Sequence, residues 1–147
     1  MLFSVIGHYS LILGLFIGLI LIFFSIKNFR NSINLDTKIL SFTFLQFILV
    51  VVSFLCLILS FVFSDFSNET VFNNSHTTKP LFYKISGTWG NHEGSLLLWL
   101  LVLTLFIFLF LIKTKDQPTK YKILTLIFQQ IIIIGFFVFL IKTSNPF

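Results

Sequence analysis

The chain has 147 residues, of which 56% are hydrophobic and 10% are charged, and its formal net charge is +5. A soluble domain carries about a quarter charged residues, so this composition excludes an ordinary water-soluble domain and indicates one helical membrane domain. In a membrane protein an excess of Lys and Arg marks the inner loops, and we interpret the charge in that way rather than as a sign of nucleic-acid binding.

Phenylalanine occurs 22 times, whereas alanine, the best helix former in water, does not occur at all. No physical reason forbids alanine in a membrane helix. Phenylalanine, isoleucine, asparagine and lysine have AT-rich codons and alanine has GC-rich ones, so the bias indicates an AT-rich genome. We therefore expect a mitochondrially encoded, multi-pass protein of the mitochondrial inner membrane, or of a bacterial inner membrane if the source is prokaryotic.

Four apolar stretches follow one another along the chain, at residues 6–26, 39–63, 94–112 and 121–141. Each is long enough to cross a hydrocarbon core about 30 Å thick, which takes about 20 helical residues. Lipid offers the backbone no hydrogen-bond partners, so such stretches are helical. A β-barrel would need alternating apolar and polar residues, and residues 96–112 do not alternate in this way. No basic region precedes the first stretch, which we expect to remain as a permanent span. The predicted fold is an all-α integral membrane domain over residues 1–147 with four transmembrane helices.

The loops between these stretches differ in charge, and this difference predicts the orientation of the chain. The loops at residues 27–38 and 113–120 are rich in Lys and Arg, whereas the long loop at residues 64–93 carries three acidic residues against Lys79 and Lys84. Basic loops face the inner side of a membrane. Both termini and the long loop are therefore predicted to face outward, toward the intermembrane space of a mitochondrion or the periplasm of a bacterium.

The long outer loop changes in composition halfway along. Residues 64–79 are rich in Ser, Asn and Thr, which predicts a mobile polar connector. The second half carries Leu81, Phe82, Tyr83 and Trp89 among glycines, a composition typical of a segment that lies at the membrane surface. An interfacial segment is thus expected just before the third span.

The segment from residue 83 to residue 99 gathers most of the chemically distinctive residues. Asn91 is a favourable N-cap, and Glu93 would lie in the first helical turn, where the helix dipole favours an acid. Adjacent residues of a helix point about 100° apart, so His92 and Glu93 cannot grip one ion together. We interpret the segment either as an interfacial anchor or as a surface that docks a partner or delivers haem. The candidate residues for that surface are Trp89, Gly90, Asn91, His92, Glu93, Gly94, Ser95 and Trp99.

Small residues recur along one side of the first span. At about 100° per residue they fall within a narrow stripe, which lets another helix approach closely. The stripe therefore predicts helix packing, and its residues are Gly7, Gly14, Gly18 and Ser25.

A few other polar residues lie within the spans. Gln46, Gln129 and Gln130 each need a hydrogen-bond partner, in the bundle or on another subunit. No charged residue lies deep in a span, which argues against an ion pump or a proton-coupled transporter. Cys56 is the only cysteine, so the chain cannot form an internal disulfide or a CxxC redox pair.

Among the histidines, His8 is the strongest candidate for a functional role, and it lies at the outer end of the first span. A histidine near a membrane surface can ligate haem or relay protons, although more often it faces water or the bundle as a polar group. The three histidines, His8, His76 and His92, lack ligand spacing, so we expect no metal site made by this chain alone. No combination of nucleophile and base is present either, and the chain alone is not expected to be an enzyme.

Three segments give the chain a recognisable resemblance. Residues 84–99, KISGTWGNHEGSLLLW, resemble the hallmark segment of CcmF-type proteins, the large subunit of the System I cytochrome c maturation machinery. His8-Tyr9-Ser10 with Gly14-Leu15-Phe16 is similar to the first helix of that family, and Thr143-Ser144-Asn145-Pro146-Phe147 to the sequence after its fourth helix. The three matches occur in order and cover nearly the whole chain.

The resemblance implies a part in the covalent attachment of haem to apocytochrome c at the outer membrane face. In the family, haem is handled by a Trp-rich external motif together with histidines on later helices. Residues 1–147 lack this centre, since Trp89 and Trp99 lie outside such a motif. We therefore expect a non-catalytic, N-terminal part of a split haem lyase subunit, which binds no cofactor alone while the assembled complex handles haem. Its expected partners are the remaining fragments, other maturation proteins and apocytochrome c.

Two other functions fit the same four spans. The chain could be a structural subunit of a larger respiratory-chain assembly that has recruited a family fragment. A small transporter is a weaker alternative, because the sequence offers neither a buried charge nor a broken helix to support it.

Overall fold

The computed structural model describes residues 1–31, 37–114 and 116–147, and within these ranges every regular element is a helix. Four of the described helices are long and apolar enough to cross a membrane: α1 (Leu2–Asn31), α2 (Thr37–Val62), α5 (His92–Lys113) and α6 (Thr119–Lys142). Two short helices, α3 (Glu69–Asn74) and α4 (Leu81–Gly87), lie between α2 and α5. The predicted all-α fold with four spans is confirmed, and the protein is a multi-pass membrane protein.

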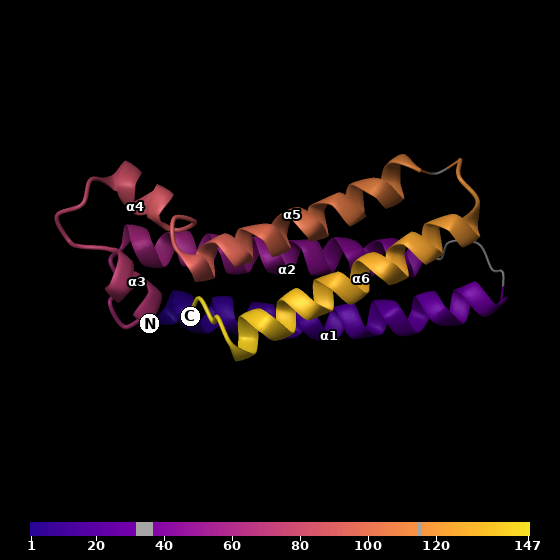
Figure 1. Ribbon diagram of the computed structural model, residues 1–147, viewed down its shortest axis with the longest axis horizontal. Helices are drawn as coiled ribbons and strands as arrows, with labels where there is room; N and C mark the ends of the chain where they lie inside the picture. The colour runs from indigo at the N-terminus through magenta and orange to yellow at the C-terminus, as the bar shows by residue number, and fades with distance from the viewer. Residues whose placement is uncertain (32–36, 115) are drawn as a thin grey trace.

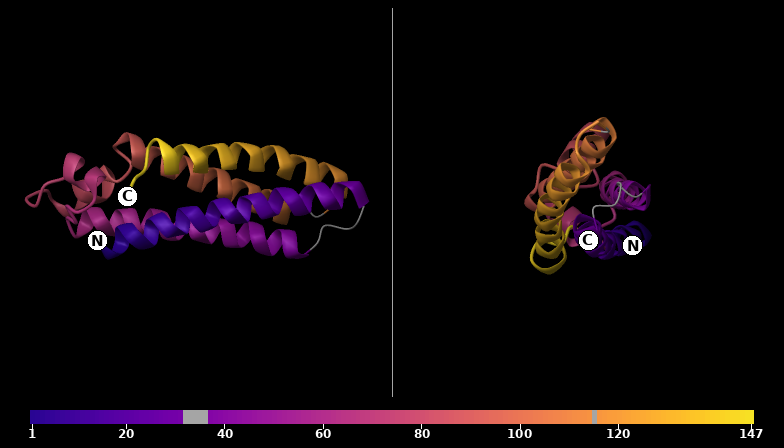
Figure 2. Two further views of the ribbon diagram at one scale, coloured as in Figure 1. Left: turned by 90° about the horizontal axis from the view of Figure 1, so that it is seen from below. Right: turned by 90° about the vertical axis from the view of Figure 1, so that its right-hand side faces the viewer.

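The four long helices form an elongated antiparallel bundle (Figures 1 and 2). α1 packs against α2 and α6, and α5 packs against the same two helices. Each long helix contributes fully buried apolar side chains to one shared core, among them Leu11, Leu57, Leu100 and Ile133. Many other large apolar side chains remain exposed along the bundle, as expected for a surface that faces lipid.

The two ends of the bundle carry different parts of the chain. Both termini, α3 and α4 lie at one end, which we call the loop end (Figure 1). The end of α1, the start of α2, the end of α5 and the start of α6 lie at the other, which we call the turn end. The predicted basic loops begin and finish at the turn end, and their residues 32–36 and 115 lie outside the described residues.

Three of the long helices run beyond the predicted spans at both ends, whereas α2 starts before the predicted span 39–63 but ends at Val62. The first span was expected at residues 6–26, whereas α1 runs from Leu2 to Asn31. The predicted fourth span, residues 121–141, likewise lies inside α6. Hydropathy marks only the part of a helix that must sit in hydrocarbon, and hydrogen bonding continues into the flanking polar residues.

The middle of the stripe of small residues on α1, at Gly14 and Gly18, faces the neighbouring helices. A Cβ atom on Gly14 would lie 2.7 Å from Cζ of Phe137, and one on Gly18 would lie 2.8 Å from Nε2 of Gln46. These glycines therefore let the backbone of α1 approach α2 and α6 closely. All four residues of the stripe are buried: Gly7, Gly14, Gly18 and Ser25.

A chain of side-chain hydrogen bonds joins three helices inside the bundle. Gln46 Nε2 donates to the Gly14 carbonyl oxygen at 3.3 Å, and Gln130 Nε2 donates to Gln46 Oε1 at 2.9 Å. Both glutamines are fully buried, whereas Gln129 is half-buried. Within the described part of the chain, no donor reaches Gln130 Oε1. The link thus ties α1, α2 and α6 together where water cannot compete.

The polar half of the long loop folds onto the bundle rather than forming the mobile connector that its composition predicts. α2 ends in a Schellman-type turn, in which the Asp65 amide donates to the Ser60 carbonyl oxygen at 2.9 Å and Ser64 adopts a φ of 52°. This turn sends the chain back across the loop end. Asn68 then caps α3, which starts one residue later.

Candidate functional site at the loop end

The three segments that carry the family resemblance meet at the loop end. The C-terminal tail, residues 143–147, lies between the start of α1 and the start of α5. The tail and α1 share a pocket that includes His8 and Asn145, and the tail and α5 share a pocket that includes Glu93 and Asn145. Residues 84–99, the first helix and the tail are thus neighbours in space although they are far apart in the sequence.

Asn91 sets the start of α5. Its Oδ1 accepts a hydrogen bond from the Gly94 amide at 2.7 Å, and its Nδ2 donates to the carbonyl oxygens of Gly87 and Thr88 at 2.9 and 3.2 Å. One side chain therefore satisfies a helix-terminal N–H and also closes the turn that leads into the helix. This is the N-cap that the sequence predicts at Asn91.

Gly94 is required where the chain folds back over the start of α5. It is buried, and a Cβ atom at this position would overlap the Thr88 carbonyl oxygen and lie 2.8 Å from the Thr88 carbonyl carbon. A side chain at this position would displace backbone rather than another side chain. The glycine therefore fixes the turn that presents Trp89, His92 and Glu93.

The other candidate residues differ in how far they are exposed. Trp89 is 42% exposed in the turn before α5, together with the exposed Gly90. His92 is exposed, and its carbonyl oxygen accepts a bond from Ser95 Oγ at 2.9 Å. Glu93 instead lines a pocket, and Trp99 lies 63% exposed further along α5, within the span. Trp89 and His92 are therefore the parts of the predicted surface that a partner outside the membrane can reach.

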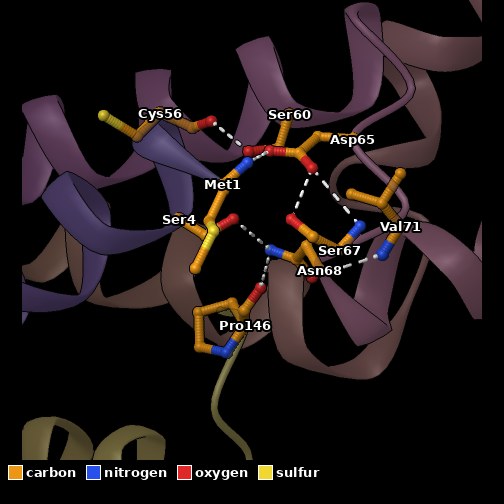
Figure 3. Close-up of polar contacts among 9 residues, drawn as sticks. All are labelled: Met1, Ser4, Cys56, Ser60, Asp65, Ser67, Asn68, Val71 and Pro146. Atoms are coloured by element: carbon orange, nitrogen blue, oxygen red, sulfur yellow. Dashed lines mark hydrogen bonds and ion pairs between the residues drawn. The ribbon is translucent and has the colours of Figure 1, made fainter.

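Asn68 connects three segments at the loop end, as Figure 3 shows. Its Oδ1 accepts from the amides of Thr70 and Val71 at 2.9 and 3.4 Å, which caps α3. Its Nδ2 donates to the Pro146 carbonyl oxygen at 3.0 Å and to Ser4 Oγ at 3.4 Å. Asn68 is 1% exposed, so these bonds are shielded from water and hold α3 against the tail and α1.

A second contact in Figure 3 ties α1 to the end of α2. The Met1 ammonium group pairs with the Asp65 carboxylate. Ser67 Oγ donates to the other oxygen of Asp65, and Ser60 Oγ donates to the Cys56 carbonyl oxygen at 3.0 Å. These contacts thus hold the part of the loop that lies between α2 and Asn68.

The tail also fixes the ring of His8. Asn145 Oδ1 accepts from the Phe147 amide at 3.0 Å, so its amide nitrogen faces His8 Nδ1 at 3.2 Å and donates to it. A neutral His8 in this contact carries its own proton on Nε2. The Phe147 ring packs on Gly7, where a Cβ atom would overlap it. Gly7 therefore makes room for the tail rather than for another helix.

Two pockets flank the tail. The first, of about 320 Å³, is lined by Glu69 of α3, Glu93 of α5 and residues 143–145 of the tail. The second, of about 350 Å³, is lined by His8, Tyr9 and the tail. The first pocket combines two carboxylates with hydroxyl and amide groups, and the second is mainly apolar with the histidine at one side.

Among the described residues, no three His, Cys, Asp or Glu side chains lie close enough together to hold a metal. At the loop end, His8 Nδ1 lies 3.2 Å from the amide nitrogen of Asn145.

Sequence reasoning missed the residues that organise the loop end. Asn68 and Ser144 lie in segments that composition describes only as polar, and their partners are remote along the chain. One sequence pattern could have identified Asn68 as a cap: asparagine is favoured at an N-cap, and an acidic residue directly after it is favoured in the first helical turn. No sequence pattern points to the contact between Asn145 and His8.

No family model matches the chain. The cytochrome c-type biogenesis protein CycK of Rhizobium meliloti (strain 1021) is 39% identical to it over 145 residues, which are 96% of this chain and 21% of that protein. CcmF of Escherichia coli (strain K12) is 35% identical over 143 residues, which are 97% of this chain and 22% of that protein. The chain therefore spans about a fifth of the length of the curated relatives it matches.

A solved structure carries the same fold. The cytochrome c haem lyase CcmF matches with a TM-score of 0.86 and 26% sequence identity, over 99% of this chain and 24% of that chain. The fold and its loop-end site define a helical, multi-pass membrane protein with an antiparallel bundle of long helices and with α3, α4 and both termini at one end. Within that class, the chain is a homologue of the CcmF-type cytochrome c biogenesis proteins, as the resemblance of residues 84–99 indicated.

Proposed function

We propose that this chain forms the N-terminal, four-helix part of a CcmF-type haem lyase and acts in the covalent attachment of haem to apocytochrome c. It contributes scaffold helices and a docking surface rather than chemistry of its own. It assembles with separately encoded parts of the lyase, with other maturation proteins and with apocytochrome c. The observation that carries the proposal is the homology to CycK and CcmF over 96–97% of the chain, supported by the shared fold.

The docking surface in this proposal is centred on Trp89 and His92. Both are exposed, and both are held by a turn that Asn91 and Gly94 make rigid. Aromatic side chains on rigid backbone lose little conformational freedom on binding and commonly dominate interface energies. A partner on the loop-end side of the membrane would therefore meet a prearranged contact.

The charge distribution supports an orientation for the chain. The turn end carries most of the Lys and Arg residues, whereas the acidic residues Asp65, Glu69 and Glu93 lie at the loop end. We propose that the turn end faces the matrix or cytoplasm and that the loop end faces the intermembrane space or periplasm. In mitoplasts or spheroplasts, a membrane-impermeant maleimide should label a cysteine placed at Ser67 but not one placed at Asp116; the reverse pattern would invert the topology.

We propose that haem is handled by the assembled lyase and that this chain holds none alone. The contact between Asn145 and His8 Nδ1 supports this, because it already occupies one of the two ring nitrogens of the histidine. Haem titration of the purified chain should give the same spectrum for the native protein and for His8→Ala. A His8-dependent, six-coordinate haem spectrum would contradict the proposal.

A chimera tests the function directly. The segment of Escherichia coli CcmF that matches this chain would be replaced by it in a strain lacking CcmF, and c-type cytochromes would be measured by haem staining after denaturing electrophoresis. We expect the chimera to restore haem attachment. Trp89→Ala with His92→Ala should reduce it at least several-fold, while the exposed His76→Ala serves as the matched control.

Measuring c-type cytochromes also distinguishes this proposal from the main alternative. If the chain is a structural subunit of another respiratory assembly, Trp89→Ala with His92→Ala in the source organism should impair that assembly and leave c-type cytochromes intact. Loss of c-type cytochromes with intact respiratory complexes is the result expected here. A purified native chain that brings down no cytochrome c maturation protein would count against the proposal.

A further inference from the structure

An apolar groove between α5 and α6 opens at the lipid-facing surface of the bundle. The two helices lie side by side and form one face of the molecule (Figure 2). The groove has a volume of about 350 Å³. Its lining comes from the second turn of α5 and the second half of α6: Leu96, Ile132, Gly135, Phe136 and Phe139. The groove therefore lies within the membrane-spanning part of the bundle, in the half nearer the loop end.

Gly135 leaves a space at this groove that no described residue fills. A Cβ atom at each other glycine of the long helices would come closer than 3.0 Å to a neighbouring residue, whereas one at Gly135 would meet nothing within 4 Å. Glycine inside a helix is destabilising relative to alanine, so its presence there needs a packing reason. In a membrane, that reason is commonly the close approach of another helix. The other glycines have their neighbours inside the described chain, and the open space at Gly135 points to a neighbour outside it.

A polar side chain continues the same stripe of α6 toward the turn end. Gln129 lies three residues before Ile132 and seven before Phe136, which at about 100° per residue places all three within about 60° of one another. Gln129 is half-buried near the middle of α6, and no described residue hydrogen-bonds its amide. An amide without a partner is costly in hydrocarbon, and a polar side chain of another helix can satisfy it. The stripe thus combines an open space with an unpaired amide.

The source of the missing neighbour is indicated by the extent of the homology. CycK and CcmF match 96–97% of this chain, yet the chain spans only about a fifth of their length. The solved CcmF structure shares the bundle over 99% of this chain, which is 24% of that structure. Most of the homologous protein therefore lies outside the part that this chain supplies. A partner that reaches the middle of a span must itself cross the bilayer there, which favours a helix.

Resting on the proposed function, we propose that the groove between α5 and α6 docks a transmembrane helix of the remaining, separately encoded part of the haem lyase. A large apolar side chain of that helix occupies the space beside Gly135, and a polar side chain bonds the Gln129 amide. Trp99, which is 63% exposed one turn along α5 from Leu96, extends the docking face. Large aromatic residues of this kind are enriched where proteins meet.

Two other contacts fit these observations less well. A lipid acyl chain could fill the groove, but it has no group that bonds the Gln129 amide. The outward face of α1 carries large apolar residues such as Leu13, Phe16 and Phe23, all exposed, and offers neither an open glycine nor an amide. That face suits lipid, whereas the face of α5 and α6 suits a protein helix.

The first test fills the groove without disturbing the fold. The tagged chain is co-expressed with the rest of Escherichia coli CcmF, here called the CcmF remainder, and the amount of this remainder that co-purifies in detergent is measured. Gly135→Leu places a side chain in the open space, so the chain should fold as before while the partner helix is excluded. Leu13→Phe is the matched control, because it adds bulk at an exposed position of α1.

We expect Gly135→Leu to lower co-purification about tenfold or more, because overpacking holds the two helices apart. Leu13→Phe should leave it unchanged, and Cys56 should stay as protected from alkylation as in the native chain in both variants. Undiminished co-purification with Gly135→Leu, or an equal loss with Leu13→Phe, overturns the groove assignment.

A second variant tests the amide without adding bulk. Gln129→Leu removes the hydrogen bond to the partner and should lower co-purification about three- to twentyfold, while leaving the isolated chain at least as stable as the native protein. Unchanged co-purification would remove Gln129 from the docking face.

Photo-crosslinking identifies the occupant directly. Benzoylphenylalanine placed at Ile132, which is 50% exposed in the groove, reacts on irradiation with the molecule that lies against it. An adduct with the CcmF remainder supports the proposal, whereas adducts only with lipid or only with a second copy of this chain overturn it. If the native chain retains no CcmF remainder, the assembly in the proposed function is refuted. If it retains the remainder while Ile132 crosslinks elsewhere, only the groove assignment is wrong.

Discussion

Replacing Gly94 by alanine should unfold the start of α5 more than the small size of the change suggests. The new Cβ would overlap the Thr88 carbonyl oxygen and lie 2.8 Å from the carbonyl carbon, whereas carbon atoms normally pack at about 3.5–4.0 Å. The obstructing atoms belong to the backbone, so no side-chain rotation relieves the overlap. Because the carbonyl oxygen lies closer still than the carbonyl carbon, the turn must move by more than about 1 Å to restore normal packing.

That movement has a cost that outweighs the gain from alanine. Overpacking in a tight site typically costs about 1–3 kcal/mol. The same shift disturbs the Asn91 cap, which is worth about 1 kcal/mol. Alanine is the better helix former by about 0.8–1.0 kcal/mol, which offsets only part of the loss. We therefore expect Gly94→Ala to lower the free energy of unfolding by about 1–3 kcal/mol.

Cys56 provides the assay. It is the only cysteine and is 7% exposed, so alkylation of its thiol reports the population of unfolded chains during a denaturant titration in detergent. Gly135→Ala is the matched control, because within the described structure nothing lies within 4 Å of a Cβ atom at Gly135. The control should be neutral or stabilising by up to about 1 kcal/mol. If Gly94→Ala is as stable as the native chain, the steric reasoning is refuted.

Two further predictions concern hydrogen bonds. Gln46→Leu removes both bonds that link three helices and should lower the free energy of unfolding by about 0.6–1.7 kcal/mol in the same alkylation assay. Combining it with Gln130→Leu should cost less than the two single changes together, because the residues share a bond; strict additivity would contradict the link. Asn68→Ala should cost about 1–2 kcal/mol through the lost cap and should speed proteolysis within residues 64–79. The exposed Asn73→Ala is its control, and equal cleavage rates would show that Asn68 does not hold the loop.

The spans could be predicted from the sequence because lipid imposes one requirement on every residue within them. A backbone in hydrocarbon must bond to itself, so a long apolar run is helical whatever its intrinsic propensity. The stripe of small residues through Gly14 and Gly18 could be predicted from helical geometry alone. The glutamines could be predicted to need partners, but the pairing of Gln46 with Gln130 depends on which helices are neighbours, and that is a property of the assembled bundle.

The loop end could be predicted only in part. The cap at Asn91 is local, because its partners lie within four residues, and the pattern of residue types was sufficient. The contacts of Asn68 are remote, since its partner Pro146 lies 78 positions further along the chain. The polar composition of residues 64–79 therefore predicted a mobile connector, whereas a tertiary contact holds this segment in a defined fold. The polar pocket was beyond prediction for the same reason.

The meeting of both chain termini at one end of the bundle decides where an experimenter can safely attach a reporter. A fusion at the amino end would replace the ammonium group that pairs with Asp65, and one at the carboxyl end would crowd the Phe147 ring where it rests on Gly7. Either tag would alter the region whose behaviour it was meant to report. An epitope inserted between α5 and α6, at the opposite end of the molecule, would leave that region untouched.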